Sequence, residues 1–259
     1  MTSFAGRYVF VAGLHRTGTS LVARMIAQHE AVRAIAGSPA PEDEGCYLQG
    51  AIPHTARHGI PGRYATEPAQ HHVEGDRFDT LETKMRIEAD WDRCFAPGGT
   101  WRVEKSPVNL TRMRLYQQLF PMAQFVIVLR HPAVMAAALA KWIDEDAATL
   151  IDYALDAYDL AFRDLEYLHA AMVLRYEDLV TNGAAAPFWR FLSLDDAPNS
   201  CKLRDGNSEY LDLARMSADQ IERASRYGYG QGGAIGGFEP VVRHPLRAVR
   251  EATRAALAG

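Results

Sequence analysis

The sequence is poor in cysteine, with only three in 259 residues, at Cys46, Cys94 and Cys201. Three is an odd number, and none of the separations is typical of the cysteine pairs that bind zinc. Secreted folds that depend on disulfides usually carry more cysteines, in even numbers. We therefore expect free, reduced thiols and a cytoplasmic location.

Long apolar runs and a strong excess of one charge are also absent. No uncharged stretch approaches the ~20 apolar residues needed to cross a bilayer, and the N-terminus lacks the basic flank and apolar run of a signal peptide. The net charge is −4, which gives no general affinity for nucleic acid or for an anionic membrane. A site for an anionic ligand must then be a local concentration of arginine and lysine.

What the sequence does contain is an alternation of apolar strand-like segments with helix-like segments. Hydrophobic residues make up 48% of the chain, and this length is sufficient for a full core. The alternation predicts an α/β fold with a parallel sheet flanked by helices on both faces. We predict a single domain over residues 1–259, with strands at 7–12, 101–104, 124–129 and 172–175 and helices at 19–29, 77–94 and 148–169.

Two segments lack this periodicity. Residues 36–76 are rich in proline, glycine, histidine and acid, which is typical of a functional loop, and we predict a substrate loop there. Residues 228–237 include six glycines, and we expect this segment to be mobile. In the helix expected at 77–94, the candidate inward residues are Leu81, Met85, Ile87 and Trp91.

A glycine-rich turn follows the first expected strand and opens the first expected helix. Gly13 and Gly18 keep the spacing of a nucleotide phosphate loop, but Thr19 stands where that loop has its lysine. Because the lysine normally reaches the β- and γ-phosphates, its loss argues against triphosphate chemistry. Backbone N–H groups at a helix start still favour an anion. The turn adds one guanidinium and three hydroxyls, from Arg16, Thr17, Thr19 and Ser20. The alternative is a turn that serves only strand-to-helix packing.

Two further basic residues follow expected strands, Lys105 and Arg130. Ligands of open parallel sheets lie beyond the carboxyl ends of the strands, so we expect both residues to converge on the glycine-rich turn. A magnesium-dependent nucleotide enzyme usually has an aspartate at such a strand end. Arg130 favours instead a second phosphate bound without metal. The alternative for Lys105 is an ordinary surface lysine, and the alternative for Arg130 is an arginine that pairs with a neighbouring acid or caps a helix.

These motifs resemble those of the PAPS-dependent sulfotransferases, and the resemblance spans most of residues 8–180. It looks closer to the carbohydrate and tyrosylprotein types, and to bacterial relatives, than to the cytosolic phenol type. The segments that carry it are Arg16 to Ser20, Glu104 to Pro107, Arg130 to Pro132 and Tyr176 to Leu179. It implies a P-loop-like fold and 3′-phosphoadenosine 5′-phosphosulfate (PAPS) as donor, with no metal.

The resemblance also implies roles for individual residues. The turn formed by Arg16, Thr17, Gly18, Thr19 and Ser20 matches the loop that holds the 5′-phosphosulfate. Arg130 matches the residue that grips the 3′-phosphate, Lys105 is expected near the transferring sulfuryl group, and Tyr176 near the nucleotide. The family often has a serine eight residues after the arginine, and Ala138 stands there, so that contact is missing or replaced.

An acceptor hydroxyl also needs a general base. Similar sulfotransferases place a catalytic carboxylate in the loop after the first helix, and Glu44 occupies that region. The alternatives are a solvated acidic loop, with His54 or His58 as the base instead. The loop histidines lack the paired spacing of a zinc site. Glu104 is expected to pair with a nearby cation.

The sequence thus predicts transfer of a sulfuryl group from PAPS to a hydroxyl of a sugar, a peptide or another small molecule. Arg16 and Lys105 would stabilise the leaving group. Two alternatives are an ATP-dependent small-molecule kinase with a degenerate phosphate loop and a non-catalytic nucleotide-binding module. No nucleic acid or membrane partner is expected, and the sequence specifies neither the acceptor nor the oligomeric state.

Overall fold

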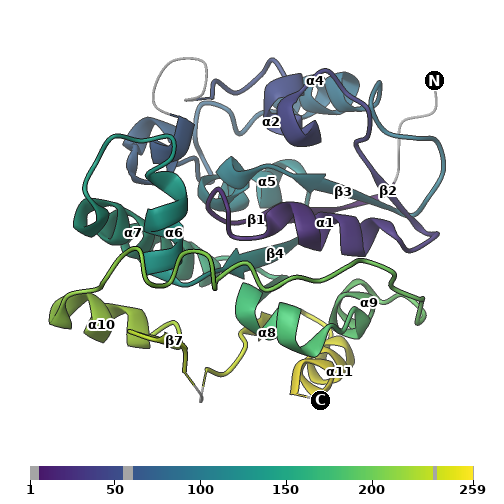
Figure 1. The fold of residues 1–259 in the computed structure, drawn as a ribbon. Helices are drawn as coiled ribbons and strands as arrows, with labels where there is room; N and C mark the ends of the chain where they lie inside the picture. The colour runs from purple at the N-terminus through teal and green to yellow at the C-terminus, as the bar shows by residue number, and fades with distance from the viewer. Residues whose placement is uncertain (1–5, 55–60, 236–237, 259) are drawn as a thin grey trace.

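A six-stranded sheet runs through the centre of the molecule (Figure 1). The structure is a computed structural model that describes residues 6–54, 61–235 and 238–258. The strand order is β2-β3-β1-β4-β5-β8. The strands are β1 (Arg7–Ala12), β2 (Val32–Ala34), β3 (Trp101–Lys105), β4 (Gln124–Leu129), β5 (Ala171–Arg175) and β8 (Val242–Arg243).

The first five strands are parallel, and β1 lies between β3 and β4. Val11 of β1 is in register with Lys105 on one side and with Val126 on the other. The three strands predicted to end at charged residues are therefore neighbours, and their carboxyl ends share one edge of the sheet. The short strand β8 pairs antiparallel with the start of β5, which makes the sheet mixed. The predicted α/β fold is confirmed, apart from this edge strand.

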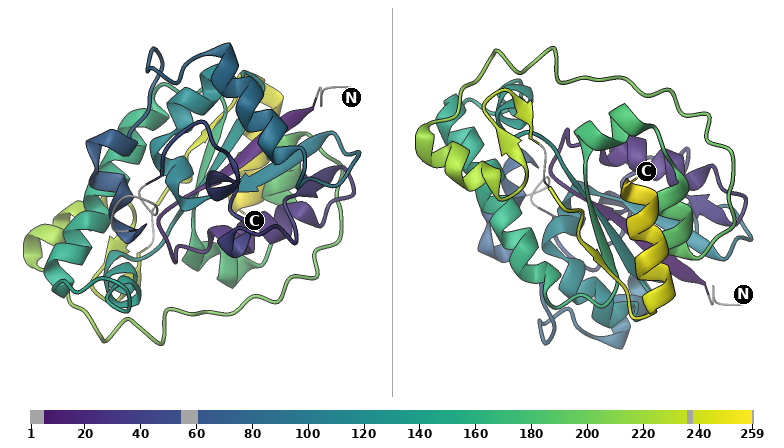
Figure 2. Two further views of the ribbon diagram at one scale, coloured as in Figure 1. Left: turned by 90° about the horizontal axis from the view of Figure 1, so that it is seen from above. Right: turned by 90° about the horizontal axis from the view of Figure 1, so that it is seen from below.

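Alternation of side chains along β1 builds one core on each face of the sheet. Tyr8 and Phe10 pack into an aromatic cluster, in which the ring centroids of Phe10 and Tyr116 are 4.7 Å apart. Val9 and Val11 belong to the core on the opposite face. The aromatic face is covered by α4 (Leu81–Trp91), α5 (Met113–Leu119), α6 (Pro132–Leu139) and α7 (Ala147–Leu165). The other face is covered by α1 (Thr19–Ala27), α8 (Tyr176–Asn182), α9 (Ala186–Leu192) and α11 (Arg247–Ala258), as Figure 2 shows.

The helix expected at 77–94 is shorter and less amphipathic than predicted. It covers residues 81–91, and the Thr80 side chain caps it by accepting a hydrogen bond from the backbone N–H of Thr83. Ile87 and Trp91 are buried, but Leu81 and Met85 are 70% and 60% exposed, so the inward prediction is wrong for the latter two. Positions 85 and 87 cannot share a helix face, because residues two apart point to nearly opposite sides.

The segments without periodicity contain short elements. Within 36–76 these are η1 (Pro41–Asp43), α2 (Gly45–Leu48), η2 (Pro61–Thr66) and η3 (Pro68–Gln70), while residues 55–60 lie outside the described residues. Within 228–237, β6 (Tyr229–Gly230) and β7 (Gly233–Ala234) form an antiparallel hairpin. A substrate role for the first segment and mobility of the second stay predictions.

The remaining elements are the 3-10 helix η4 (Pro107–Thr111) and the helix α10 (Ala218–Ser225). A long connection over residues 193–217 links α9 to α10 without a helix or strand. Within the described ranges, no helix is both long enough and apolar enough to span a membrane.

Candidate active site

The loop between β1 and α1 has a backbone that only certain residues tolerate. Gly18 has a φ of 100°, and Arg16 adopts the left-handed region with a φ of 71°. A Cβ atom on Gly18 would lie 2.7 Å from the ring of Tyr176, so glycine is required there. Thr19 and Ser20 then begin α1, and N–H groups at a helix start have no intrahelical acceptor. These groups, with the helix dipole, leave the end of the loop ready for an anion.

Thr17 holds the loop together from within. Its side chain is fully buried, and its hydroxyl donates to the carbonyl oxygen of Leu14 at 2.8 Å. In this structure the hydroxyl is therefore used within the loop, and its predicted contact with a bound anion stays a prediction. Thr17 contributes to the site by fixing the turn.

The loop forms one wall of a cavity of about 480 Å³ at the carboxyl edge of the sheet. We call it the charged cavity. Of the nine site residues predicted from the sequence, all except Thr17 and Lys105 line it, namely Arg16, Gly18, Thr19, Ser20, Glu44, Arg130 and Tyr176. The other lining residues are His15, Leu21, Arg24, Glu42, Pro107, Trp142, Lys202 and Arg204. Residues from seven separate parts of the chain thus meet around one cavity rich in cations.

Arg130 is buried and held on several sides. Its guanidinium lies over the ring of Tyr176, 4.4 Å from the ring centroid. Its Nε donates to Oδ1 of Asn207 at 2.8 Å, and its Nη1 donates to the carbonyl oxygen of Arg16 at 2.7 Å. Among the described residues, no acceptor is bonded to Nη2. That nitrogen is left for a ligand in the charged cavity.

Lys105 and Glu44 form a buried ion pair beside this cavity. The Nζ atom of Lys105 lies 3.1 Å from Oε1 of Glu44, and it also donates to the carbonyl oxygen of Glu42 at 3.0 Å. Burial raises the pKa of Glu44 to about 7, against the opposing effect of Lys105, while the charges of Glu104 and Glu42 raise it further. Glu44 therefore changes its protonation state near neutral pH, as a general base should.

Glu104 fixes the backbone next to Glu44. Its Oε1 accepts from the N–H of Gly45 at 2.9 Å and from the Ser106 hydroxyl at 2.5 Å, and its Oε2 accepts from the Asn109 amide at 2.6 Å. Burial raises the pKa of Glu104. The expected pairing of Glu104 with a cation is wrong, since its hydrogen-bond donors are neutral. Its position points to control of the loop that carries Glu44.

The described histidines of the 36–76 segment each contact a different side chain. His54 is buried, with its ring 4.9 Å from that of Tyr47. His71 bonds to Asp164 and His72 to Asp76, while His58 lies outside the described residues. Within the part of the chain that the structure describes, no three His, Cys, Asp or Glu side chains gather as metal ligands would. His54 does not line the charged cavity, so Glu44 is the better candidate for the base.

Several cavity residues were not predicted from the sequence. Trp142, in the connection between α6 and α7, is 58% exposed and lies 5.7 Å from the guanidinium carbon of Arg16. His15 lies against Trp142, and burial lowers the pKa of its imidazole to about 4, so it is neutral at physiological pH. Lys202 and Arg204 reach the cavity from the long α9–α10 connection. No sequence pattern marks these residues, because their positions depend on loop paths.

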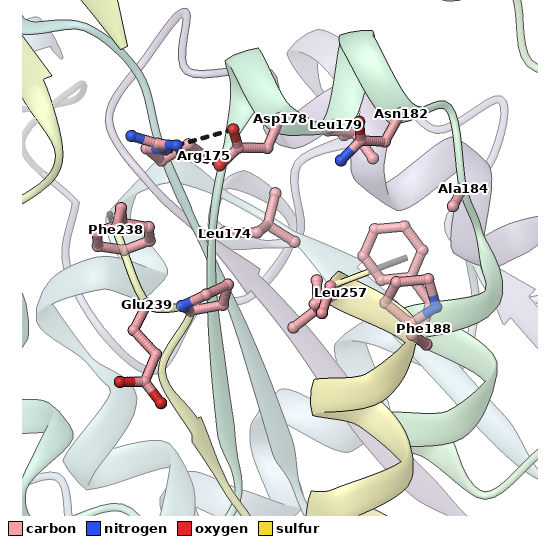
Figure 3. A pocket seen from close by; sticks show the side chains of 14 residues that line it. Leu174, Arg175, Asp178, Leu179, Asn182, Ala184, Phe188, Phe238, Glu239 and Leu257 are labelled. Atoms are coloured by element: carbon pink, nitrogen blue, oxygen red, sulfur yellow. Dashed lines mark hydrogen bonds and ion pairs between the residues drawn. The ribbon is translucent and has the colours of Figure 1, made fainter. Parts of the chain in front are cut away.

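A second cavity, of about 460 Å³, is lined by residues of α8, α9 and α11 (Figure 3). We call it the apolar cavity, because Leu174, Phe188, Phe238 and Leu257 are among its lining residues. Its one arginine, Arg175, is already bonded to Asp178. The described residues that line this cavity therefore offer no free cation to a phosphate or sulfate.

The model of the sulfotransferase family matches residues 8–186. No curated protein sequence matches the chain.

Three solved structures share the fold at low sequence identity. A sulfotransferase domain from the curacin biosynthetic pathway has a TM-score of 0.56 at 14% identity, over 88% of this chain and 99% of that one. The sulfotransferase domain of the Synechococcus PCC 7002 olefin synthase has a TM-score of 0.54 at 17% identity, over 86% and 95%. A sulfotransferase from Mycobacterium avium has a TM-score of 0.52 at 12% identity, over 86% and 76%. The resemblance predicted from the sequence is thereby confirmed, although its subtype stays a prediction. From the family match over more than half of its length, the chain belongs to the sulfotransferase family.

Proposed function

We propose that this protein transfers a sulfuryl group from PAPS to a hydroxyl of a small-molecule, sugar or peptide acceptor. The observation that carries the proposal is the charged cavity, in which the loop from Arg16 to Ser20, Arg130 and Glu44 meet. Lys105 adjoins it through its 3.1 Å contact with Glu44. Two anion-binding elements and a carboxylate with a raised pKa are what such a transfer requires.

The residues of the charged cavity fit a nucleotide with two anionic groups. The N–H groups of Thr19 and Ser20 and the guanidinium of Arg16 suit the 5′-phosphosulfate. The Nη2 atom of Arg130 suits the 3′-phosphate. Tyr176 packs against Gly18 and beneath Arg130, so its ring joins the two anion-binding elements into one wall.

The donor, when bound, supplies the sulfuryl group and a phosphate that leaves with a negative charge. By analogy with phosphoryl transfer, most of the catalysis is positioning and charge stabilisation. The α1 N-terminus, Arg16 and Lys105 are the groups that stabilise this charge. Hydrogen bonds to charged groups contribute roughly 1.5–3 kcal/mol each, so the loss of one costs tenfold or more in rate.

Glu44 is the group that takes the proton from the acceptor hydroxyl. Lys105 keeps the carboxylate of Glu44 oriented, and Glu104 holds the adjacent backbone N–H of Gly45. When the base takes up a proton, its attraction for the lysine ammonium weakens. Lys105 is then freer to follow the charge that forms on the leaving group.

A third cavity, of about 360 Å³, is a suitable entrance for the acceptor. It shares Ser20, Arg24 and Glu42 with the charged cavity, and Lys105 lines it. Ala34 of β2 and Val103 of β3 also line it, so it lies on the opposite side of β1 from β4, which Arg130 follows. An acceptor there would reach Lys105 without displacing a ligand held by Arg130.

Two measurements test the proposal. Calorimetry should detect binding of adenosine 3′,5′-bisphosphate without added metal, and sulfur-labelled PAPS should transfer label to some member of a panel of sugars, peptides and phenols. Absence of nucleotide binding would reject the proposal. Magnesium-dependent binding of ATP would favour the kinase alternative, and binding without transfer, together with an inert Lys105→Ala change, would favour a non-catalytic module.

A further inference from the structure

A tight turn from the α9–α10 connection encloses the guanidinium of Arg130. The turn runs from Arg204 to Asn207, and the hydroxyl of Tyr176 anchors it. This hydroxyl donates to the carbonyl oxygen of Arg204 at 2.6 Å and accepts from the N–H of Gly206 at 3.2 Å. The side chain of Asp205 accepts from the N–H of Asn207 at 2.8 Å and closes the turn.

Asn207 is the residue of this turn that contacts Arg130 with its side chain. It is 4% exposed. Its Oδ1 accepts from Nε of Arg130 at 2.8 Å, and its Nδ2 donates to Oε1 of Glu177 at 2.7 Å. The amide is therefore fixed between a cation and a carboxylate and cannot rotate without the loss of both bonds.

Glu177 is itself fixed by two other parts of the chain. Its Oε1 also accepts from the N–H of His131 at 3.0 Å, and its Oε2 accepts from the hydroxyl of Tyr229 at 3.0 Å. A continuous set of hydrogen bonds thus leads from the start of α6 and the β6–β7 hairpin, through Glu177 and Asn207, to the guanidinium of Arg130.

The consequence is that one nitrogen of Arg130 is presented in a single direction. Nε is bonded to Asn207, Nη1 to the Arg16 carbonyl, and the face of the group rests on Tyr176. The backbone of Gly206 lies beside Nη2, where an added Cβ would be only 3.0 Å away. A side chain at position 206 would crowd this nitrogen, so glycine there helps to keep it accessible to a ligand.

We propose that Asn207 is a positioning residue that aims Nη2 of Arg130 at the second phosphate of the donor, so that the Arg204–Asn207 turn selects a nucleotide with two anionic groups. This inference rests on the proposed function, and it assigns to the α9–α10 connection a part in nucleotide selection. An oriented guanidinium loses little conformational freedom on binding, which increases affinity without an added contact.

A purely structural role for Asn207 would have a different signature. Loss of a buried amide that only holds the connection in place would weaken binding of all nucleotides alike or leave it unchanged. Loss of a positioning residue weakens only the nucleotides that carry the second phosphate. The ratio of affinities for adenosine 3′,5′-bisphosphate and adenosine 5′-monophosphate separates the two roles.

The experiment is calorimetry of both nucleotides with the full chain and its variants. We expect Asn207→Ala to weaken bisphosphate binding about tenfold and to leave monophosphate binding within twofold. Asn199→Ala is the matched control, since Asn199 also closes a turn in the same connection by accepting from the N–H of Cys201. An unchanged ratio in Asn207→Ala would overturn the inference.

Two further variants guard against simple unfolding. Gly206→Ala keeps every hydrogen bond of the turn but brings a methyl group against Nη2, and it should lower bisphosphate affinity alone. Asn207→Asp keeps the size of the side chain and the acceptor for Nε of Arg130 but removes the donor to Glu177, and it should also lower the ratio of bisphosphate to monophosphate affinity. Equal losses of affinity for the bisphosphate and the monophosphate in these variants would contradict the inference. A wild-type chain that binds neither nucleotide would instead reject the proposed function.

Discussion

β4 and β5 are neighbouring parallel strands, and a buried arginine stands at the carboxyl end of each. Arg175 is the last residue of β5 and lies opposite Leu129, so Arg130 lies only one residue further along its own strand. Both guanidinium groups lie near aromatic rings, Arg130 over Tyr176 and Arg175 over Phe238. The two residues nevertheless belong to different regions, one to the charged cavity and the other to the apolar cavity.

The difference lies in how many nitrogens the protein itself uses. All three nitrogens of Arg175 are bonded, Nε and Nη2 to Asp178 and Nη1 to the carbonyl oxygens of Gly228 and Ile235. Arg130 has bonds from two nitrogens to the described residues, and Nη2 is left over. A cation at a strand end is therefore a binding residue only where the fold leaves one of its donors without an acceptor.

The largest effect should come from the base in the charged cavity. Glu44→Gln should lower turnover by about 100- to 10,000-fold, because the amide cannot take the acceptor proton, while nucleotide binding stays intact. The measurement is transfer of labelled sulfate together with calorimetry of adenosine 3′,5′-bisphosphate. Asp178→Asn serves as the matched change in the apolar cavity and should keep its turnover. Retained turnover in Glu44→Gln would remove this residue from catalysis.

The two arginines give the most direct test of the comparison. Arg130→Ala should weaken bisphosphate binding about 10- to 100-fold, because it removes a charge-assisted contact with the second phosphate. Arg175→Ala should leave that affinity within about twofold but lower the free energy of unfolding by roughly 2–3 kcal/mol, through the loss of its hydrogen bonds. Denaturant unfolding gives the stability of each variant, and calorimetry gives its affinity for adenosine 3′,5′-bisphosphate. If Arg175→Ala weakened binding as much as Arg130→Ala, the distinction between the two regions would fail.

A moderate effect is expected on the pH dependence of turnover. The pKa of Glu44 is raised to about 7, so turnover should fall as the pH drops below 7 and the base becomes protonated. Glu104→Gln removes one negative charge that raises this pKa, while Lys105 and Glu42 keep their effects, and the midpoint should move to lower pH. A pH–rate profile of both proteins checks this. An unmoved midpoint would mean that Glu104 does not influence the base.

The smallest effect concerns Ala138, where related sulfotransferases often have a serine. Ala138 is buried in α6 with Val134 and Tyr210, so a hydroxyl there would face packed side chains. We expect Ala138→Ser to change bisphosphate affinity by less than about threefold and to lower stability by about 1 kcal/mol. A clear gain in affinity would show that the charged cavity extends to this face of α6.

The parts of the site that the sequence predicts well are those fixed by strands. Arg16, Lys105 and Arg130 lie at or after the ends of β1, β3 and β4, whose parallel order brings their carboxyl ends together. The sequence near each arginine also indicates the difference between them. Asp178 stands three residues after Arg175, whereas Ala133 stands three residues after Arg130. An acid at that spacing indicates a pair that is satisfied within the protein.

The unpredicted parts depend on contacts between distant segments. Asn207 is more than 70 residues from Arg130 in the chain, and nothing around it has a period that indicates burial. Trp142 lies in a connection whose path is set by α6 and α7. The start of α10, in contrast, has a local signal in the sequence, because Ser217 and Gln220 form a capping box.

The bond from Arg130 to the carbonyl oxygen of Arg16 ties two walls of the charged cavity to each other. Arg16 holds a left-handed backbone that few side chains favour, and part of what keeps it there is a donor from the neighbouring strand. Substitution of either arginine should therefore weaken the contacts with both phosphate groups of the proposed donor. The loss of affinity in the double variant should be smaller than the sum of the losses in the two single variants.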